Sequence, residues 1–150
     1  MKIKTLGYAS QMKGGKENII NNIKALLKPN ELIVDVRERP FGLINMPDLR
    51  RELRDQYFWA KEWGNPSYKN AETFKERLTK IINYSKLKGL DTLILMCAEV
   101  DVNRCHRKDI KQKIIHTLPE CEDGEDIGSR ESKSARVQSP IKQRTLAMLL

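Results

Sequence analysis

Three short runs rich in apolar and β-branched residues, separated by helical patterns, place the tightest constraint on the fold. Residues 91–97 form a continuous apolar run of the kind that a parallel sheet buries on both faces. Residues 31–37 are rich in Ile and Val and predict a central strand, and residues 2–9 predict a first, short one. A strand, a helix and a strand in such a short stretch form a βαβ unit, whose crossover is right-handed by default. The sequence therefore predicts an α/β fold, a small single-domain three-layer sandwich with a mostly parallel sheet.

Helical patterns fill the intervals between these strands. Apolar residues at helical spacing predict helices over 19–27, about 48–57, 71–88 and about 103–118. The third helix has an Asn before it and a Gly after it, which are residues that favour a helix start and a helix end. The stretch 57–68 holds many aromatic residues together with a Gly and a Pro, and it is predicted to be a loop.

The composition changes after Pro119. An acidic stretch is followed by a stretch rich in Ser, Lys and Arg, and neither shows apolar periodicity. The prediction is an α/β domain over 1–118 and a flexible, charged C-terminal tail over 119–150. Residues 141–150 could end this tail with a short amphipathic helix.

The positive charge is concentrated in the predicted domain. The chain has 28 Lys and Arg against 20 Asp and Glu, a net charge of +8. Residues 119–150 hold five of these basic and six of these acidic residues, which leaves 23 and 14, a net +9, in residues 1–118. This excess favours an anionic partner, such as a nucleotide, a nucleic acid or a phosphorylated metabolite. The alternative is a lysine-rich surface that serves only solubility.

The cysteine count bears on the compartment. Three cysteines at irregular spacing do not form the even set of a secreted disulfide framework, so free thiols in a reducing, cytoplasmic compartment are expected. No apolar run approaches the roughly 20 residues that a membrane-spanning helix needs, so no membrane partner is expected. The N-terminus resembles a first strand more than a secretion signal.

Polar side chains follow the ends of all three predicted strands. Tyr8 follows the first strand, Asp35 and Arg37 end the second, and Cys97 and Glu99 end the third. Ligands of open α/β sheets bind beyond the carboxyl ends of the strands, so these residues are expected to form one site.

The segment after the third strand adds a second set of candidates. Arg104, Cys105, His106 and Arg107 lie where the last predicted helix begins. A helix start offers free N–H groups and the positive end of a dipole, so it binds anions and lowers the pKa of a nearby thiol. The two arginines of this segment, together with Arg39, are candidates for binding phosphate or carboxylate.

Each candidate also has a purely structural explanation. Cys97 could be a small buried side chain, and Glu99 an ordinary surface residue. Asp35, between two valines, needs a partner if it is buried, and Arg37 or Arg107 could supply a structural ion pair.

No cofactor or metal is predicted. The cysteines and histidines lack the CxxC spacing of a zinc site, and Gly14-Gly15-Lys16 lacks the spacing of a phosphate-binding Walker loop.

Five elements in order resemble domain-of-unknown-function family 488 over about residues 3–118. They are Thr5-Leu-Gly-Tyr8, Leu32-Ile-Val-Asp-Val-Arg-Glu-Arg-Pro40, Trp63-Gly64, Leu95-Met-Cys-Ala-Glu99 and Cys105-His-Arg107. That family has no assigned activity, so the resemblance implies a compact α/β fold and a shared pocket but no reaction. The residues it would gather are Tyr8, Asp35, Arg37, Pro40, Gly64, Cys97, Glu99, Cys105, His106 and Arg107. The chain departs from the pattern in having Ala9 directly after Tyr8, and in showing no clear strand after the last helix.

The first functional hypothesis is a pocket that binds or acts on a phosphate-bearing ligand, with the question of catalysis open. A cysteine would be the nucleophile, an imidazole or carboxylate the general acid or base, and guanidinium groups the anion ligands. Rhodaneses and cysteine phosphatases share the strand–Cys–loop–helix layout, but the segment from Cys97 to Arg104 is too long for the phosphatase loop and lacks its Gly. The candidates for these roles are Cys97, Cys105, His106, Glu99 and Asp35 for chemistry, and Tyr8, Arg37, Arg39, Arg104, Arg107 and Trp63 for binding.

The alternative is a non-catalytic accessory protein that binds nucleic acid. It would use the basic surface for backbone contacts, and Trp59 and Trp63 for stacking on bases. The more ordinary role of these two tryptophans is packing. A third hypothesis is an interaction module whose C-terminal segment recruits a partner.

Overall fold

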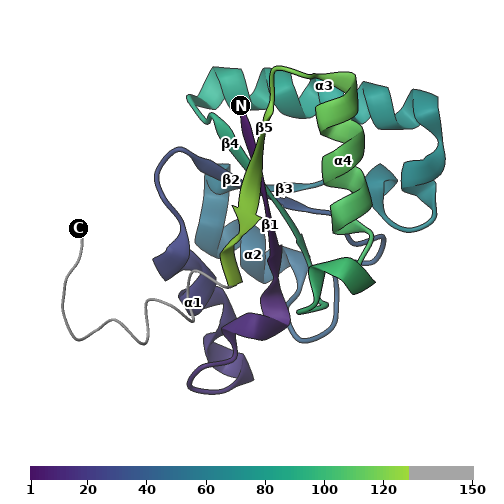
Figure 1. Ribbon diagram of the computed structural model, residues 1–150. Helices are drawn as coiled ribbons and strands as arrows, with labels where there is room; N and C mark the ends of the chain where they lie inside the picture. Colours follow the sequence, from purple (N-terminus) through teal and green to yellow (C-terminus); the bar gives the residue numbers. More distant parts are fainter. Residues whose placement is uncertain (129–150) are drawn as a thin grey trace.

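The computed structural model describes residues 1–128, which form one α/β domain around a sheet of five parallel strands (Figure 1). The strand order is β3-β2-β4-β1-β5, and every neighbouring pair is parallel. The predicted fold class is therefore confirmed. The strands are β1 (Lys2–Gly7), β2 (Glu31–Asp35), β3 (Tyr57–Trp59), β4 (Thr92–Cys97) and β5 (Glu122–Asp126).

Four α-helices cover the two faces of the sheet. The helices α1 (Ile19–Leu26) and α2 (Met46–Leu53) pack on one face, and α3 (Ala71–Lys88) and α4 (Arg107–Thr117) pack on the other (Figure 1). Each face has its own apolar core, because alternate residues of β2 and β4 point to opposite sides of the sheet. These are the three layers that the sequence predicts.

The predicted caps form in the structure. The Asn70 side chain accepts a hydrogen bond from Thr73 N at 3.0 Å, and Gly89 ends α3 with a left-handed φ of 70°. The Asn45 side chain likewise accepts from Asp48 N at 3.0 Å at the start of α2.

The prediction of a flexible tail from residue 119 is wrong as far as residue 128. Residues Glu122–Asp126 form β5, which pairs with β1 at the edge of the sheet. This strand has no apolar side chain, so hydrophobic patterns do not reveal it; backbone pairing holds it. Its charges meet partners, since Asp123 lies 2.7 Å from Lys111 Nζ and Asp126 accepts from the Thr5 hydroxyl at 2.8 Å. Residues 129–150, including the predicted helix over 141–150, lie outside the described residues.

Three further boundaries differ from the prediction. The helix expected over about 48–57 is α2, which starts two residues earlier and ends at Leu53. The stretch expected to be a loop over 57–68 begins with β3, which pairs with β2 before the Gly and Pro residues are reached. The last helix begins at Arg107, because a separate 3-10 turn, Val102–Arg104, precedes it. The segment Arg104–His106 therefore lies at the entrance to α4.

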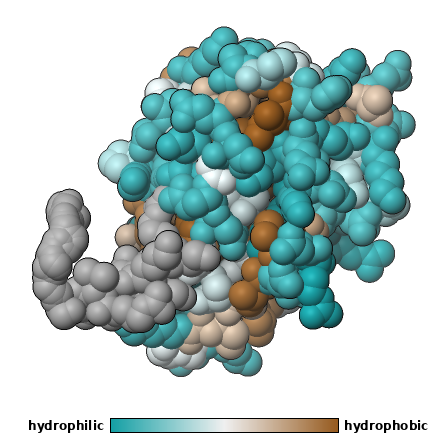
Figure 2. All heavy atoms as spheres, viewed as in Figure 1, coloured by the Kyte–Doolittle hydropathy of each residue, from teal (hydrophilic) through white to brown (hydrophobic). Residues whose placement is uncertain are grey.

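Within residues 1–128, no helix is both long and apolar enough to cross a membrane. The face seen in Figure 2 is mostly hydrophilic, with small, separate apolar areas.

Candidate active site at the carboxyl edge of the sheet

The segments that follow β1, β2 and β4 meet at one edge of the sheet. Val36 N donates to Met96 O at 3.0 Å, and Ala9 N donates to Ala98 O at 3.2 Å. Gly7 lies against the Glu99 carbonyl oxygen so closely that a Cβ at this position would clash with it. The absence of a side chain at Gly7 is what allows the two segments to touch.

The sheet nevertheless divides the predicted site residues into two clusters. Asp35 belongs to the face covered by α1 and α2, whereas Cys97 belongs to the face covered by α3 and α4. We call Tyr8, Asp35, Arg37 and Tyr57 the Asp35 cluster, and Cys97, Cys105, His106 and Arg107 the disulfide cluster. The single pocket that the sequence predicts is therefore two separate groups of side chains.

The Asp35 cluster is a closed ion pair. The Asp35 carboxylate is fully buried and accepts from Arg37 Nε at 2.8 Å and Nη2 at 2.7 Å, and from the Tyr57 hydroxyl at 2.6 Å. Arg37 Nη1 donates to Ile44 O at 2.8 Å, and the guanidinium lies 5.2 Å from the centre of the Tyr8 ring. The polar atoms of Asp35 and Arg37 thus bind other groups of the protein. This is the structural ion pair that the sequence offered as the alternative to a functional Asp35.

The titration of this cluster reflects its burial. Burial opposes the charge of Arg37, but the hydrogen bonds and the charge of Asp35 outweigh it, so the pKa of Arg37 is raised. Burial, followed by the negative charge of Asp35, raises the pKa of the Tyr57 hydroxyl. Arg37 therefore stays charged and Tyr57 stays neutral, and their contacts with Asp35 leave none of the three side chains free to hold an external ligand.

The tryptophans and the nearby loop contribute packing. Trp63 is fully buried and stacks on Phe74 with ring centres 4.8 Å apart, so it is not available to a base or other ligand. Trp59 is half-buried, and its Nε1 donates to Arg37 O at 2.8 Å. Arg39 is exposed in the loop that follows the Asp35 cluster.

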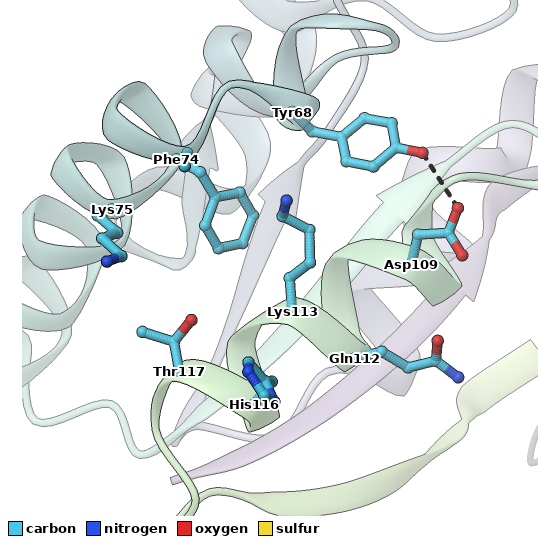
Figure 3. A pocket seen from close by; sticks show the side chains of 9 residues that line it. Tyr68, Phe74, Lys75, Asp109, Gln112, Lys113, His116 and Thr117 are labelled. Carbon is cyan, nitrogen blue, oxygen red and sulfur yellow. Dashed lines mark hydrogen bonds between the residues drawn. The ribbon is translucent and has the colours of Figure 1, made fainter.

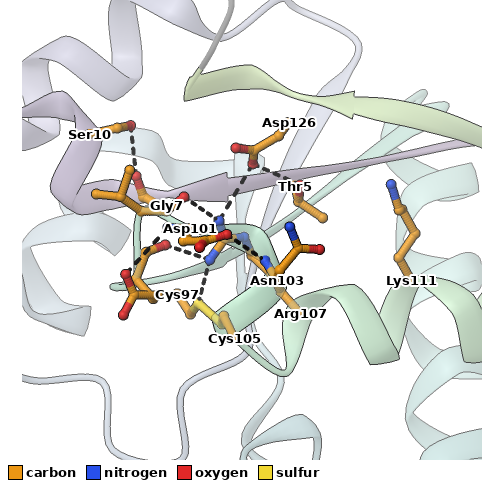
Figure 4. A network of polar contacts seen from close by, with 12 residues as sticks. Thr5, Gly7, Ser10, Cys97, Asp101, Asn103, Cys105, Arg107, Lys111 and Asp126 are labelled. Atoms are coloured by element: carbon orange, nitrogen blue, oxygen red, sulfur yellow. Dashed lines mark hydrogen bonds and ion pairs between the residues drawn. A yellow bond between two sulfur atoms is a disulfide. The ribbon is translucent and has the colours of Figure 1, made fainter.

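Cys97 and Cys105 form a disulfide, so the prediction of free thiols is wrong for these two residues (Figure 4). They are eight positions apart, but the end of β4 and the entrance to α4 bring them together. Cys121 is free and buried, and its burial raises the pKa of its thiol.

Arg107 is buried beside the disulfide (Figure 4). Its Nη1 donates to Cys97 Sγ at 3.1 Å and to Glu99 O at 2.5 Å, and its Nη2 donates to Val100 O at 3.0 Å. The nearest carboxylate oxygen recorded for it belongs to Asp126, 3.7 Å from Nη2, and Nε has no partner within the described residues. Burial lowers the pKa of this guanidinium. Arg107 is thus a buried cation whose charge is only partly balanced, and it does not reach an external anion.

His106 links the disulfide cluster to β2. Its Nε2 lies 2.8 Å from the Val36 carbonyl oxygen, and because a carbonyl only accepts, Nε2 carries a proton. In the neutral ring, Nδ1 then holds a lone pair, and it lies 3.8 Å from Cys105 Sγ. The ring packs beside Tyr68, with centres 5.5 Å apart.

The Glu99 side chain is exposed. Its carboxylate accepts from Asp101 N at 3.3 Å, which helps to hold the loop between β4 and α4. Its backbone oxygen, not its carboxylate, contacts Arg107.

A polar cavity opens beside the disulfide, at the start of α4. We call it the α4 cavity; its volume is about 450 Å³. Cys105 and His106 contribute to its wall, and the basic side chains around it come from Lys69, Arg104 and Lys108. Lys69 could not be inferred from strand ends, since it lies in the turn before α3. The remaining lining residues are Asn65, Tyr68, Asn103, Asp109 and Gln112.

A second hollow lies next to the α4 cavity, between α3 and α4 (Figure 3). It has a volume of about 460 Å³ and shares Tyr68, Asp109 and Gln112 with the α4 cavity. The Tyr68 hydroxyl donates to Asp109 at 3.0 Å, and Lys113 Nζ lies 5.1 Å from the centre of the Phe74 ring. The Tyr68–Asp109 pair lies between the polar α4 cavity and this second, more apolar hollow.

Among residues 1–128, no group of three or more His, Cys, Asp and Glu side chains could hold a metal ion.

Comparisons with known protein families, with curated proteins and with solved structures gave no match. The resemblance to domain-of-unknown-function family 488 therefore stays a prediction from the sequence.

Proposed function

We propose that this protein binds a small phosphate-bearing ligand, such as a nucleotide or a phosphorylated metabolite, in the α4 cavity. The observation that carries the proposal is the set of basic side chains around that cavity. Lys69, Arg104 and Lys108 come from two separate segments and line the same space at the positive end of the α4 dipole.

The charges in the cavity wall favour an anion. Asp109 is the acidic residue among the lining side chains, and its carboxylate already accepts a hydrogen bond from Tyr68. Lys108 contacts the neutral Asn103 side chain at 2.9 Å, so its charge is not balanced by that partner. A phosphate group in this position would gain charge-assisted hydrogen bonds.

The size of the cavity favours a small molecule over a nucleic acid strand. A volume of about 450 Å³ lies within the usual range of small-molecule sites. The burial of Trp63 removes one of the two stacking platforms on which the nucleic-acid hypothesis rests. In this proposal Lys69, Arg104 and Lys108 bind the anion, in place of Arg37 and Arg107, which the sequence suggested for that role. We place the protein in the cytoplasm, as its composition predicts.

Calorimetric titration with ATP and with inorganic pyrophosphate tests the proposal. Arg104→Ala and Lys108→Ala should each weaken binding about tenfold, because each removes a charge-assisted hydrogen bond. Arg50→Ala is the matched control, since Arg50 is exposed on α2, which covers the other face of the sheet. Binding that is equally weakened by the control, or no binding of either probe by the wild-type protein, would contradict the proposal.

A further inference from the structure

We propose that Cys97 and Cys105 are a redox-active pair that undergoes thiol–disulfide exchange with a small thiol entering the α4 cavity. The inference does not depend on the binding of phosphate. It rests on the unequal access to the two sulfurs and on the groups that contact each of them.

The two sulfurs differ in access from solvent. Cys105 is half-buried and lines the α4 cavity, whereas Cys97 ends a buried strand and is only 4% exposed. In exchange, a thiolate attacks one sulfur and the other leaves. The geometry makes Cys105 the sulfur that is attacked, and Cys97 the leaving group.

The leaving sulfur has a cation beside it. Arg107 Nη1 lies 3.1 Å from Cys97 Sγ, and the other recorded contacts of this guanidinium are two carbonyl oxygens and Asp126 at 3.7 Å. A thiolate at Cys97 would supply the negative charge that the buried guanidinium lacks. A neighbouring cation of this kind lowers the pKa of a thiol and makes it a better leaving group.

Acidic groups near Arg107 oppose a thiolate there. Asp126 approaches from β5, and Glu99 and Asp101 from the loop before α4. Glu99 and Asp101 are exposed, so solvent screens them, whereas Arg107 is buried in direct contact with the sulfur. Asp126 is partly buried, but it lies 3.7 Å from Nη2 and accepts from the Thr5 hydroxyl, whereas Nη1 is 3.1 Å from Cys97 Sγ. The proposal is that the attraction of Arg107 outweighs the repulsion of these three carboxylates.

The attacked sulfur has a proton acceptor beside it. His106 donates from Nε2 to Val36, so the Nδ1 lone pair of the neutral ring is available toward Cys105 Sγ at 3.8 Å. In the reduced protein this nitrogen can accept a hydrogen bond from the Cys105 thiol. The reduced pair would thus consist of a Cys97 thiolate held by Arg107 and a Cys105 thiol beside His106.

The reaction has two steps. A substrate thiolate attacks Cys105 Sγ; a bond forms between the substrate sulfur and Cys105, the Cys97–Cys105 bond breaks, and Cys97 leaves as a thiolate. A second substrate thiolate then attacks the substrate sulfur of this mixed disulfide, and Cys105 leaves and takes up a proton. Two substrate thiols are oxidised to one disulfide, and the protein disulfide is reduced to a thiol and a thiolate. The reverse reaction with an oxidised small disulfide restores the pair.

A structural disulfide is the competing explanation. In a reducing compartment such a bond would be transient and catalytic or redox-sensing, and the glutathione experiment below distinguishes that from a purely structural bond. The chain also offers an internal comparison, since Cys121 is buried and, among residues 1–128, accepts no hydrogen bond from a guanidinium of the kind that Cys97 accepts; the cation near it is the N-terminal amine.

The first experiment equilibrates the full, folded chain in glutathione buffers of graded ratio and maps the cysteines by alkylation and mass spectrometry. Cys97 and Cys105 should interconvert together between disulfide and dithiol, while Cys121 stays a thiol throughout. Circular dichroism checks that the protein remains folded. Resistance of the disulfide to reduced glutathione until the chain unfolds would overturn the proposal.

The second experiment tests access to the two sulfurs with two matched variants, Cys97→Ser and Cys105→Ser, both treated with oxidised glutathione at a pH above the ordinary thiol pKa of about 8.5, so that a difference in thiolate fraction does not decide the rates. The accessible Cys105 of the first variant should form the mixed disulfide at least tenfold faster than the buried Cys97 of the second. Equal rates, or a faster reaction at Cys97, would overturn the assignment.

The third measurement addresses Arg107 without altering it. The ultraviolet absorbance of thiolates is followed with pH in the reduced wild-type protein and in reduced Cys97→Ser. The wild type should gain a thiolate well below the ordinary thiol pKa of about 8.5, and the variant should lack it. Identical titrations of the two proteins would show that Arg107 does not stabilise a Cys97 thiolate. Loss of phosphate binding in the calorimetric experiment would leave all three of these results unchanged.

Discussion

Asp35 and Cys97 end neighbouring strands, but their side chains leave the sheet on opposite faces. In the register of β2 and β4, Asp35 lies beside Met96, so Cys97 is one position further along. Because side chains alternate along a strand, this single step places the two residues in different cores. Which residues end the strands can be read from the sequence; the register that separates them cannot.

At the scale of single residues, we predict that Asp35 stabilises the fold and takes no part in ligand binding. Asp35→Asn would leave Arg37 as a buried charge without its carboxylate partner, which should lower the free energy of unfolding by about 3 kcal/mol. Asp55→Asn is a suitable control because its ion pair with Lys88 is exposed, and such pairs contribute little. Urea unfolding gives the free energies, and calorimetry with pyrophosphate gives the binding. A stable Asp35→Asn protein that no longer binds would assign Asp35 to the ligand site instead.

At the scale of elements, a 3-10 turn and a helix are joined by one ion pair. Glu62 lies in the turn Lys61–Trp63 and accepts from Arg77 of α3 at 2.7 and 2.8 Å. The hydrogen bond from Arg77 lowers the pKa of Glu62 below its ordinary value of 4.5. A carboxyl whose pKa is lower in the folded state stabilises the protein above the unfolded pKa and loses this contribution as the pH falls through the folded pKa.

The prediction is therefore a difference in acid sensitivity. The pH range from about 6 to about 3 spans the folded and unfolded pKa values of a paired carboxyl. Over this range the free energy of unfolding should fall more for the wild-type protein than for Arg77→Ala. The pair is only partly buried, with 19% of the Arg77 side chain and 40% of the Glu62 side chain exposed, so solvent screens it and the difference should be small. Urea unfolding at both pH values measures it, with Arg50→Ala as the control that should follow the wild type. Parallel losses in wild type and Arg77→Ala would show that the pair does not couple the two elements.

The elements also show where prediction from sequence ends. The helices over 19–27 and 71–88 and the strands β2 and β4 could be predicted because their apolar periodicity and end residues agree with the fold. The edge strand β5 could not, because its side chains are acidic or absent and its stability comes from backbone pairing and from ion pairs with Lys2 and Lys111. The short strand β3 could not be predicted either, because the Gly and Pro that follow it favour a loop.

At the scale of the whole molecule, the carboxyl edge of the sheet carries two different clusters of polar side chains, the Asp35 cluster and the disulfide cluster. On the face of α1 and α2, Asp35, Arg37 and Tyr57 hydrogen-bond to one another, and Arg37 also donates to the Ile44 backbone oxygen. On the face of α3 and α4, the charge of the buried Arg107 beside the disulfide is only partly balanced. The α4 cavity, with its basic side chains, opens next to Cys105. The residue types at this edge could be predicted from the sequence, but the pairing of Cys97 with Cys105 and the contribution of Lys69 depend on the folded arrangement of distant segments.

The most direct test of a ligand site on the α3 and α4 face is an NMR titration of the isotope-labelled protein with pyrophosphate. The largest shifts should fall on the backbone amides of Lys69 and of residues 104–109, which surround the α4 cavity. The amides of Tyr8, Arg37 and Tyr57 should move little. Shifts centred on those three residues, or spread evenly over the lysines of the surface, would contradict the site proposed for this protein.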